Sequence, residues 1–585
     1  MIKKFTLNKN IFFILIPLIF TLIYYRFEVI YGFNPTDEGR NFALINRVLN
    51  FDIPHKDFTF THFIGSTLLH FYQEFIPSHN IQISRMQNML FMFFYSYVFL
   101  DKIEAFKNSN FLYKIILFFA TSLINFHIFP MFSWPTVDGI FLFSLFLFLE
   151  DKLSKSKQKF GYLILGFLPL IKFGFVLLIP TIFIRNIYFK KNINVSEQVK
   201  YLKYSCIPLF VYTMIISLFG GFKDLVSVTT DTVFQLDLYL NGLGLNSIAW
   251  IYYTVIAFTF LQISLKKKSR FAANICIFIY LYILETRYFN VLLDKNISEM
   301  TPIGISQMYE FNKPNIFLLG LFFFVFNLFN KKFKNFKNEF EILFLLLAVE
   351  ASSILSFGWK LSQWVYGSIL MTLLIIINRS KLQDSDKSVI DTKKSSVILI
   401  LSIFSIILLN TFQQRNDYNY RDLGNSELQY NLIEVDKSFG NIKTNKNTFS
   451  YLNNLKTCST QIDSSRIHFF PDNPIMYFIL DIQNPLPISW HEAISEEVKL
   501  DNLKTEEKIS LLTKDDFPFY IILQDNFAAL LINESYDEVV TFSNFDSFSN
   551  SDKLEIIKLY KTKLKHNTYL CGGFEIMIVE GLNNK

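Results

Sequence analysis

The stretch "NPTDEGRNFALINRVLNFDIPHKDF", residues 34–58, follows the first strongly apolar run of the chain. Two adjacent acids, Asp37 and Glu38, open it, and Arg40 and Arg47 lie two helical turns apart. The apolar residues that recur at helical spacing are Phe42, Ile45, Val48 and Leu49. This pattern predicts an amphipathic helix that lies on a membrane surface, with the acids at its N-terminus. Asp37 as a simple helix N-cap is the alternative.

The composition around this stretch is that of a polytopic membrane protein. The chain has 585 residues, of which 51% are hydrophobic, and its mean hydropathy is +0.29. These values are too high for a soluble enzyme of this length. The net charge is +6, but the basic residues form short clusters between apolar runs, as cytoplasmic loops do. The sequence therefore excludes nucleic-acid binding.

Apolar runs of about 20 residues can each cross a bilayer as a helix. Candidate spans begin near Ile11, Met86, Phe111, Pro135, Cys206, Ile248, Phe271, Asn315, Glu341, Gln363 and Val397. The positive-inside rule places the N-terminus in the cytoplasm and the tail after about residue 412 outside. The first span lacks a cleavage site and is expected to stay in the mature protein.

One apolar segment does not fit this alternation as a single helix. The run "GYLILGFLPLIKFGFVLLIPTIFI", residues 161–184, lies between two basic clusters but has the length of one ordinary crossing. Two short half-helices that meet near "LIKFG" restore the orientation, with Lys172 at the tip of the hairpin, inside the bundle. One tilted helix with a weakly obeyed charge rule is the alternative. Counting the hairpin as two, the sequence predicts about 13 transmembrane helices.

The predicted fold is an all-α polytopic membrane domain followed by an extracytoplasmic α/β domain. The membrane domain covers residues 1–411, with outer juxtamembrane helices at about 36–78, and the α/β domain covers 412–585. Short β-like runs such as "SRIHFFP", "FPFYIILQ" and "GGFEIMIVEG" alternate with charged helical stretches in that tail. Cys458 and Cys571 lie there and can pair in an oxidising compartment. The sequence does not decide whether these two cysteines form a disulfide or are free thiols.

Several charged residues of the outer loops are candidates for function. Asp138 in "FPMFSWPTVDGIF" lies at or just within the membrane surface, where an ionisable residue is costly and marks a functional site. Its alternative is a solvated loop acid. A second helix over residues 61–76 brings His62 and His70 to the interface. Lys360 lies between two spans. It is either a cation that binds substrate or a lysine whose long side chain snorkels so that its charge reaches the membrane interface.

Three motifs together resemble the multispanning glycosyltransferases of the GT-C fold, especially protein O-mannosyltransferases and lipid A aminoarabinose transferases. They are "TDEGRNFALINRVLNFD" after the first span, "LGFLPLIKFGFVLLIP" with its lysine–glycine break, and "PDNPIMYFILDIQNPLP" in the tail. Two departures stand out. The family's lysine–proline pair is replaced by "TFTHFIG", where His62 takes its place, and its Glu-Ala-Arg pattern is replaced by "WPTVDG", which offers Asp138.

The resemblance implies transfer of a sugar from a polyprenyl-phosphate donor in the bilayer to a glycan, lipid or protein acceptor, by direct inverting displacement. It implies Asp37 as general base, with Glu38 and Asp138 as further catalytic candidates. The implied donor-phosphate ligands are Arg40, Arg47, His62, Lys172 and Lys360. The Cys and His spacing predicts no zinc site, and a role for a divalent cation stays open.

Two rival functions belong to other classes of membrane protein. An O-antigen polymerase or ligase relies on arginines in large later outer loops, whereas this chain places its acids after the first span. A transporter or flippase of lipid-linked sugars commonly has paired structural repeats, and this sequence has no visible internal repeat. The glycosyltransferase hypothesis accounts for the acidic pair and the outer tail together.

Overall fold

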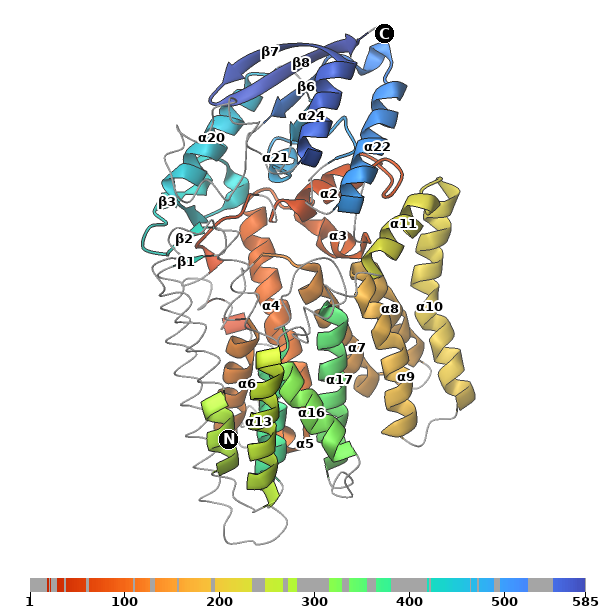
Figure 1. Cartoon of the computed structure of the whole chain (residues 1–585), viewed down its shortest axis with the longest axis vertical. Coiled ribbons are helices and arrows are strands. Elements are labelled where there is room, and N and C mark those ends of the chain that lie inside the picture. Colours follow the sequence, from red (N-terminus) through yellow and green to blue (C-terminus); the bar gives the residue numbers. More distant parts are fainter. Residues whose placement is uncertain are drawn as a thin grey trace, which may run out of the picture.

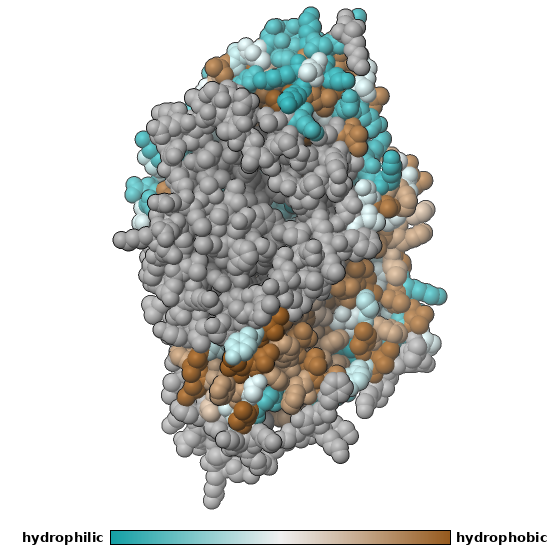
Figure 2. Space-filling view, in the orientation of Figure 1, coloured by the Kyte–Doolittle hydropathy of each residue, from teal (hydrophilic) through white to brown (hydrophobic). Residues whose placement is uncertain are grey.

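The computed structural model places a helical bundle beneath a C-terminal α/β region, with α2 and α3 between them (Figure 1). Hydrophilic residues gather over the α/β region, and hydrophobic residues cover much of the visible coloured surface of the bundle (Figure 2). The structure describes residues 18–19, 22, 29–35, 38–58, 63–108, 111–126, 132–154, 157–190, 195–233, 248–266, 272–280, 315–328, 336–354, 364–379, 418–419, 422–462, 465–470, 473–488, 495–523 and 551–583.

The helices that precede the α/β region differ widely in length. The two short outer helices and the 3-10 helix that follows them are α2 (Arg40–Leu49), α3 (Gly65–His70) and η2 (Phe71–Phe75). The others are α4 (Asn80–Asp101), α5 (Glu104–Lys107), α6 (Phe111–Phe126), α7 (Pro135–Lys152), α8 (Gln158–Ile171), η4 (Phe173–Leu177), α9 (Leu178–Tyr188), α10 (Val195–Leu218), α11 (Phe222–Val233), α13 (Ile248–Lys266), α16 (Asn315–Leu328), α17 (Lys337–Ile354) and α18 (Tyr366–Arg379).

The prediction of about 13 transmembrane helices is wrong. Within the described residues, one helix, Ser196–Leu218, is long and apolar enough to cross a membrane. The shorter apolar helices are Tyr113–Asn125, Gln158–Ile171, Phe173–Tyr188, Thr254–Leu265, Ile316–Leu328 and Tyr366–Asn378. At 10–17 residues each they are about 15–26 Å long, less than the roughly 30 Å of a bilayer core.

Polar residues inside the predicted spans explain the error. The run counted from Met86 belongs to α4, which begins at Asn80 and carries the buried Arg85 and Asn88 in its first turns. The run counted from Pro135 belongs to α7, which buries Asp138 near one end and holds Glu150 near the other. Apolar side chains of these helices form a large core inside the bundle, so high hydropathy here reflects helix packing as well.

The turn at Lys172 is confirmed. Helix α8 ends at Ile171, Lys172 is extended with φ −156° and ψ 124°, and η4 leads into α9. The Nδ2 of Asn186, near the end of α9, donates to the hydroxyl of Tyr162 near the start of α8 at 3.1 Å. The two segments therefore run antiparallel. The prediction that these two segments each cross the membrane is wrong together with the prediction of about 13 transmembrane helices.

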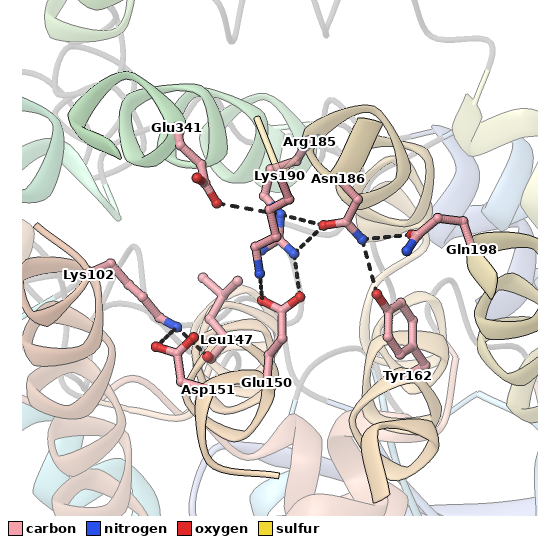
Figure 3. Close-up of polar contacts among 10 residues, drawn as sticks. All are labelled: Lys102, Leu147, Glu150, Asp151, Tyr162, Arg185, Asn186, Lys190, Gln198 and Glu341. Atoms are coloured by element: carbon pink, nitrogen blue, oxygen red, sulfur yellow. Dashed lines mark hydrogen bonds and ion pairs between the residues drawn. The ribbon is translucent and has the colours of Figure 1, made fainter. Parts of the chain in front are cut away.

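A polar network fixes the ends of this hairpin opposite its tip (Figure 3). Arg185 of α9 donates to Glu150 of α7 at 2.5 Å and lies 3.7 Å from Glu341 of α17. Lys190 lies 3.1 Å from Glu150, and Lys102 of α4 pairs with Asp151 at 2.6 Å. These ion pairs join α4, α7 and α17 to the end of the hairpin.

The α/β region contains the strands that the structure describes, in three small sheets. The two-stranded sheets pair β1 (Tyr418–Asn419) with β2 (Asp422–Leu423) and β3 (Tyr430–Asn431) with β4 (Lys443–Thr444). The four-stranded sheet has the order β5 (Ile467–Phe470), β6 (Phe519–Leu523), β8 (Phe574–Leu582), β7 (Leu564–Cys571). Strand β5 runs parallel to β6, and the other pairs are antiparallel.

Three strands of the large sheet and helix α24 were predicted from their sequence runs, whereas β7 was not. The remaining helices of the region are η7 (Leu432–Glu434), η8 (Lys437–Phe439), α20 (Lys446–Thr460), α21 (Ile475–Ile479), α22 (Ser495–Leu511), η9 (Lys514–Asp516) and α24 (Ser551–Lys563). Strand β7 is an edge strand with mostly exposed side chains, so it has little apolar alternation to reveal it.

Helix α2 exists as predicted, but it does not lie on a surface. Its residues from Asn41 to Arg47 are buried, because α21 of the α/β region packs on it. The rings of Phe42 and Phe478 lie 4.7 Å apart, and the Gly39 backbone approaches that of Ile475 so closely that a side chain on Gly39 has no room. The α/β region therefore covers the helix face expected to meet lipid or water.

A disulfide joins Cys458, in α20, to Cys571, at the end of β7. The bond closes a loop with a sequence separation of 113 residues and ties the helix to the edge of the sheet. It settles the question that the sequence left open. Such bonds persist in oxidising compartments.

We expect Cys571→Ser to lower the stability of the α/β region by about 2–5 kcal/mol, because the unfolded chain gains the conformations that the closed loop forbids. Thermal unfolding of the full chain, followed by near-ultraviolet circular dichroism, measures the loss. Cys206→Ser is the matched control, since Cys206 is a free cysteine. Equal melting temperatures for Cys571→Ser and the control contradict the expectation.

Candidate functional site

The first turn of α7 carries the most completely buried acid among the predicted site residues. Pro135 occupies the first helical position, and Asp138 follows within the first turn, where the helix dipole favours a negative charge. Asp138 is fully buried. Its Oδ2 accepts a hydrogen bond of 2.6 Å from Ser66, and both its oxygens lie 3.0 Å from Nε2 of His70.

His70 and Ser66 reach Asp138 from α3 because residues four apart share one helix face. The Nδ1 of His70 lies 3.1 Å from the side-chain amide nitrogen of Gln73. If this amide donates to Nδ1, the proton of a neutral imidazole sits on Nε2 and points to Asp138. Asp138 then accepts hydrogen bonds from two donors, Ser66 and His70.

Lys172 reaches the same helix turn from the tip of the α8–α9 hairpin. Its ammonium donates to the hydroxyl of Thr136 at 2.8 Å and to the carbonyl of Ser353 at 2.6 Å. Gly139 leaves the space next to α7 that the ring of Phe175 fills, which seats the hairpin tip there. Glu350 of α17 is fully buried and interacts electrostatically with this ammonium.

The structure thus places two of the predicted site residues at the first turn of α7, Asp138 within that turn and Lys172 through its hydrogen bond to Thr136. We name this cluster the α7 site, and its members are Ser66, His70, Thr136, Asp138, Lys172 and Glu350. They come from α3, α7, the hairpin tip and α17. It combines a hydrogen-bonded carboxylate with a buried ammonium, the two kinds of group that proton transfer and phosphate stabilisation need.

Glu38 does not face this cluster as a ready proton acceptor. Its two oxygens accept hydrogen bonds of 2.5 and 2.6 Å from the guanidinium of Arg85, and the pair is buried. Arg85 also donates to the backbone carbonyls of Val29 and Gly32. We infer that the pair holds the segment before α2 against α4, and that Glu38 acts as a positioning residue.

Arg47 is committed to contacts with the α/β region and with its own loop. It donates to Asp52 at 2.9 Å and to the backbone carbonyl of Leu486, and its guanidinium lies over the ring of Phe58. Burial lowers the pKa of Arg47, and Asp52 opposes that shift. Burial likewise raises the pKa of Asp52 against the effect of Arg47. These contacts favour a structural role for Arg47 over a phosphate contact.

His55 and Lys504 form a second link between the outer loop and the α/β region. Lys504 of α22 donates to the backbone carbonyl of His55 at 2.6 Å and pairs with Asp224 of α11 at 2.8 Å. Burial, with the nearby charge of Lys504, lowers the pKa of His55 to about 3. His55 is therefore neutral at pH 7 and contributes packing at this interface.

Of the four remaining predicted site residues, the structure describes Arg40 and does not describe the other three. Arg40 opens α2 and is partly buried. Asp37, His62 and Lys360 lie outside the described residues. Their predicted roles as base and phosphate ligands stay predictions.

Sequence reasoning missed the supporting residues of the α7 site. It did not single out Ser66, and it placed His70 at the interface without naming its partner. Glu350 left a usable signal, because it is an acid inside the apolar run "EILFLLLAVEASSIL", and an ionisable residue in such a run marks a functional candidate. The neighbours of Asp138 left no such signal, since a serine and a histidine in a short helix are common.

Among the described residues, no group of three or more His, Cys, Asp or Glu side chains could hold a metal ion. Comparison with protein-family models, with curated proteins and with solved structures finds no match to this chain. The assignment of function therefore rests on the site and on the sequence motifs.

We expect Arg85→Met to lower the stability of the bundle by about 3–5 kcal/mol, because it leaves the Glu38 carboxylate buried without its partner. Adding Glu38→Gln in the same chain is expected to recover part of the loss, since the buried charge is gone. Thermal unfolding of the purified protein measures both variants. If Arg85→Met alone is as stable as the natural chain, the pair of Glu38 and Arg85 does not have the proposed positioning role.

Proposed function

We propose that this chain is a membrane-bound glycosyltransferase that moves a sugar from a polyprenyl-phosphate donor to a glycan, lipid or protein acceptor on the extracytoplasmic side. The observation that carries the proposal is the α7 site, where the carboxylate of Asp138 and the ammonium of Lys172 lie at the same helix turn, each with its own hydrogen-bond partners. The three sequence motifs that resemble those of the GT-C glycosyltransferases, one of which contains Lys172, support it as well.

Attachment to a bilayer is supported by α10. Its segment Ser196–Leu218 has 23 residues, which gives a helix of about 34 Å, enough to cross a bilayer core of roughly 30 Å. Only 22% of its most apolar stretch is buried. Phe210 and Leu218 are 64% and 78% exposed. Such a surface is stable against lipid acyl chains and costly in water.

The disulfide supports the extracytoplasmic placement of the α/β region, because Cys458 and Cys571 stay bonded where the environment is oxidising. The α/β region docks on α2 and lies at the same end of the structure as α3, which contributes to the α7 site (Figure 1). We therefore place the site at the extracytoplasmic end of the bundle.

The proposed reaction is a single displacement at the anomeric carbon. The acceptor oxygen forms its bond to that carbon while its proton passes to a carboxylate, and the bond from the carbon to the donor phosphate oxygen breaks. The electron pair leaves with the polyprenyl phosphate, and the anomeric centre is inverted. Asp37 is the proposed base, and Asp138 is the second carboxylate candidate.

Lys172 is suited to the leaving phosphate. A lysine ammonium has three N–H donors, of which the described contacts use two, on Thr136 and Ser353. The third is available to an anion that approaches the hairpin tip. Arg40 is the other proposed phosphate ligand among the described residues, and His62 and Lys360 are proposed from the sequence alone.

We expect Asp138→Asn to lower the rate of sugar transfer by about 10²-fold or more, because the amide cannot carry the charge that orders Ser66 and His70. Proteoliposomes with radiolabelled polyprenyl-phosphate hexoses, pentoses or aminopentoses measure the transfer through release of polyprenyl phosphate. Asp436→Asn, whose carboxylate pairs with Lys456 in the α/β region, is the matched control.

Two results contradict the proposal in different ways. Unchanged transfer by Asp138→Asn, with melting behaviour like the control, removes Asp138 from the reaction. Movement of the labelled lipid between leaflets without release of polyprenyl phosphate by the natural chain indicates a flippase, the main rival function.

A further inference from the structure

Three side chains beside the α7 site are buried without hydrogen-bond partners. Glu350 and Asn88 are fully buried, and within the described residues no side chain hydrogen-bonds to the carboxyl group of Glu350 or to the amide of Asn88. The indole N–H of Trp134 is buried and equally without a partner. Each such group costs about 1–3 kcal/mol when nothing else satisfies it. Natural structures keep such groups for a bound water, ion or ligand.

The contacts of Glu350 and Trp134 place both next to Lys172. Glu350 interacts electrostatically with the ammonium of Lys172, and its carboxyl group lies near the backbone N–H of Val365. Trp134 immediately precedes α7, two residues before Thr136, which accepts from Lys172. The rings of Trp134 and Trp364 lie 6.4 Å apart, and Trp364 is the neighbour of Val365.

Asn88 belongs to the same region because of its place on α4. Ser84, one helical turn earlier, is hydrogen-bonded to Ser133 at 2.5 Å. Tyr95, two turns later, donates to the carbonyl of Trp364 at 2.7 Å. Residues 84, 88 and 95 follow one stripe of the helix. Asn88 therefore points between the start of α7 and Trp364.

The chemistry of this group favours a neutral ring with several hydroxyls. Glu350 offers two acceptors, Trp134 one donor, and Asn88 both kinds, which suits hydroxyl groups that donate and accept. The carboxyl group of Glu350 disfavours a phosphate on its own side of Lys172, so a neutral polyhydroxyl group suits the space beside Glu350, Asn88 and Trp134. The rings of Phe132 and Trp134, with centroids 4.7 Å apart, add flat apolar surface.

We propose that Asn88, Trp134 and Glu350 form a subsite that holds the sugar ring of the donor by its hydroxyl groups. This inference rests on the proposed glycosyltransferase function. Lys172 then stands at the boundary between the sugar and the phosphate, with Glu350 on the sugar side. The hydroxyls of the bound sugar replace the partners that the three side chains lack.

The test compares binding of polyprenyl phosphate with and without a sugar. The natural chain in nanodiscs is titrated with polyprenyl phosphate and with polyprenyl phosphates that carry a hexose, a pentose or an aminopentose, and the tightest sugar-bearing lipid is kept as the probe. Glu350→Gln and Asn88→Ala are expected to weaken binding of that probe by about tenfold each. Their affinity for polyprenyl phosphate alone is expected to stay unchanged.

The outcomes separate the subsite from the function. The subsite is overturned if both variants bind the sugar-bearing probe as tightly as the natural chain does. It is also overturned if the variants lose affinity equally for the probe and for polyprenyl phosphate alone. In both cases recognition of the lipid phosphate by the natural chain still stands. If the natural chain binds neither lipid, the proposed function itself fails, and the subsite fails with it.

A thermal measurement guards against a purely structural role. Glu350→Gln removes a buried charge that has no hydrogen bond, so without donor we expect its melting temperature to equal or exceed that of the natural chain. A clear fall in the melting temperature of Glu350→Gln indicates that Glu350 stabilises the fold, and this result overturns the subsite. Trp134→Phe, which keeps an aromatic ring and removes the N–H, is the third variant. It is expected to lower the affinity for the sugar-bearing probe and to leave the affinity for polyprenyl phosphate alone unchanged.

Discussion

The ammonium of Lys172 holds the tip of the α8–α9 hairpin against the first turn of α7 through Thr136 and the Ser353 carbonyl. This contact joins three parts of the chain that lie far apart in the sequence. It gives the hairpin tip a polar anchor in the bundle and holds the charge of Lys172 at the helix turn that also carries Asp138. Thr136 and Lys172 of the α7 site are joined by this contact, whereas Asp138 is held by Ser66 and His70 of α3.

The two ends of the bundle use charge in opposite ways. At the end shown in Figure 3, Arg185, Glu150 and Lys190 satisfy one another, which suits a clamp that keeps the hairpin closed. At the other end, Glu350 and Asn88 are buried without hydrogen bonds. Ion pairs therefore tie the helices together at the first end, whereas the polar groups of Glu350 and Asn88 at the second end are the ones we propose for recognition of a ligand.

Local patterns in the sequence predicted part of this structure. The break at "LIKFG" predicted the hairpin, and alternation predicted β5, β6 and β8. The span count failed, because hydropathy does not distinguish a helix packed in a core from one that faces lipid. The burial of α2 depends on α21, more than 400 residues later. Ser66 and Glu350 depend on tertiary contacts in the same way, so no local pattern revealed their place in the site.

The central claim is that the α7 site binds a lipid-phosphate sugar at the first turn of α7. A structure of the protein with a non-transferable polyprenyl-phosphate sugar analogue tests it most directly. We expect the phosphate within hydrogen-bond reach of Lys172 and the sugar ring between Trp134 and Glu350. A donor bound elsewhere, with Asp138, Lys172 and Glu350 away from the ligand, would contradict the account.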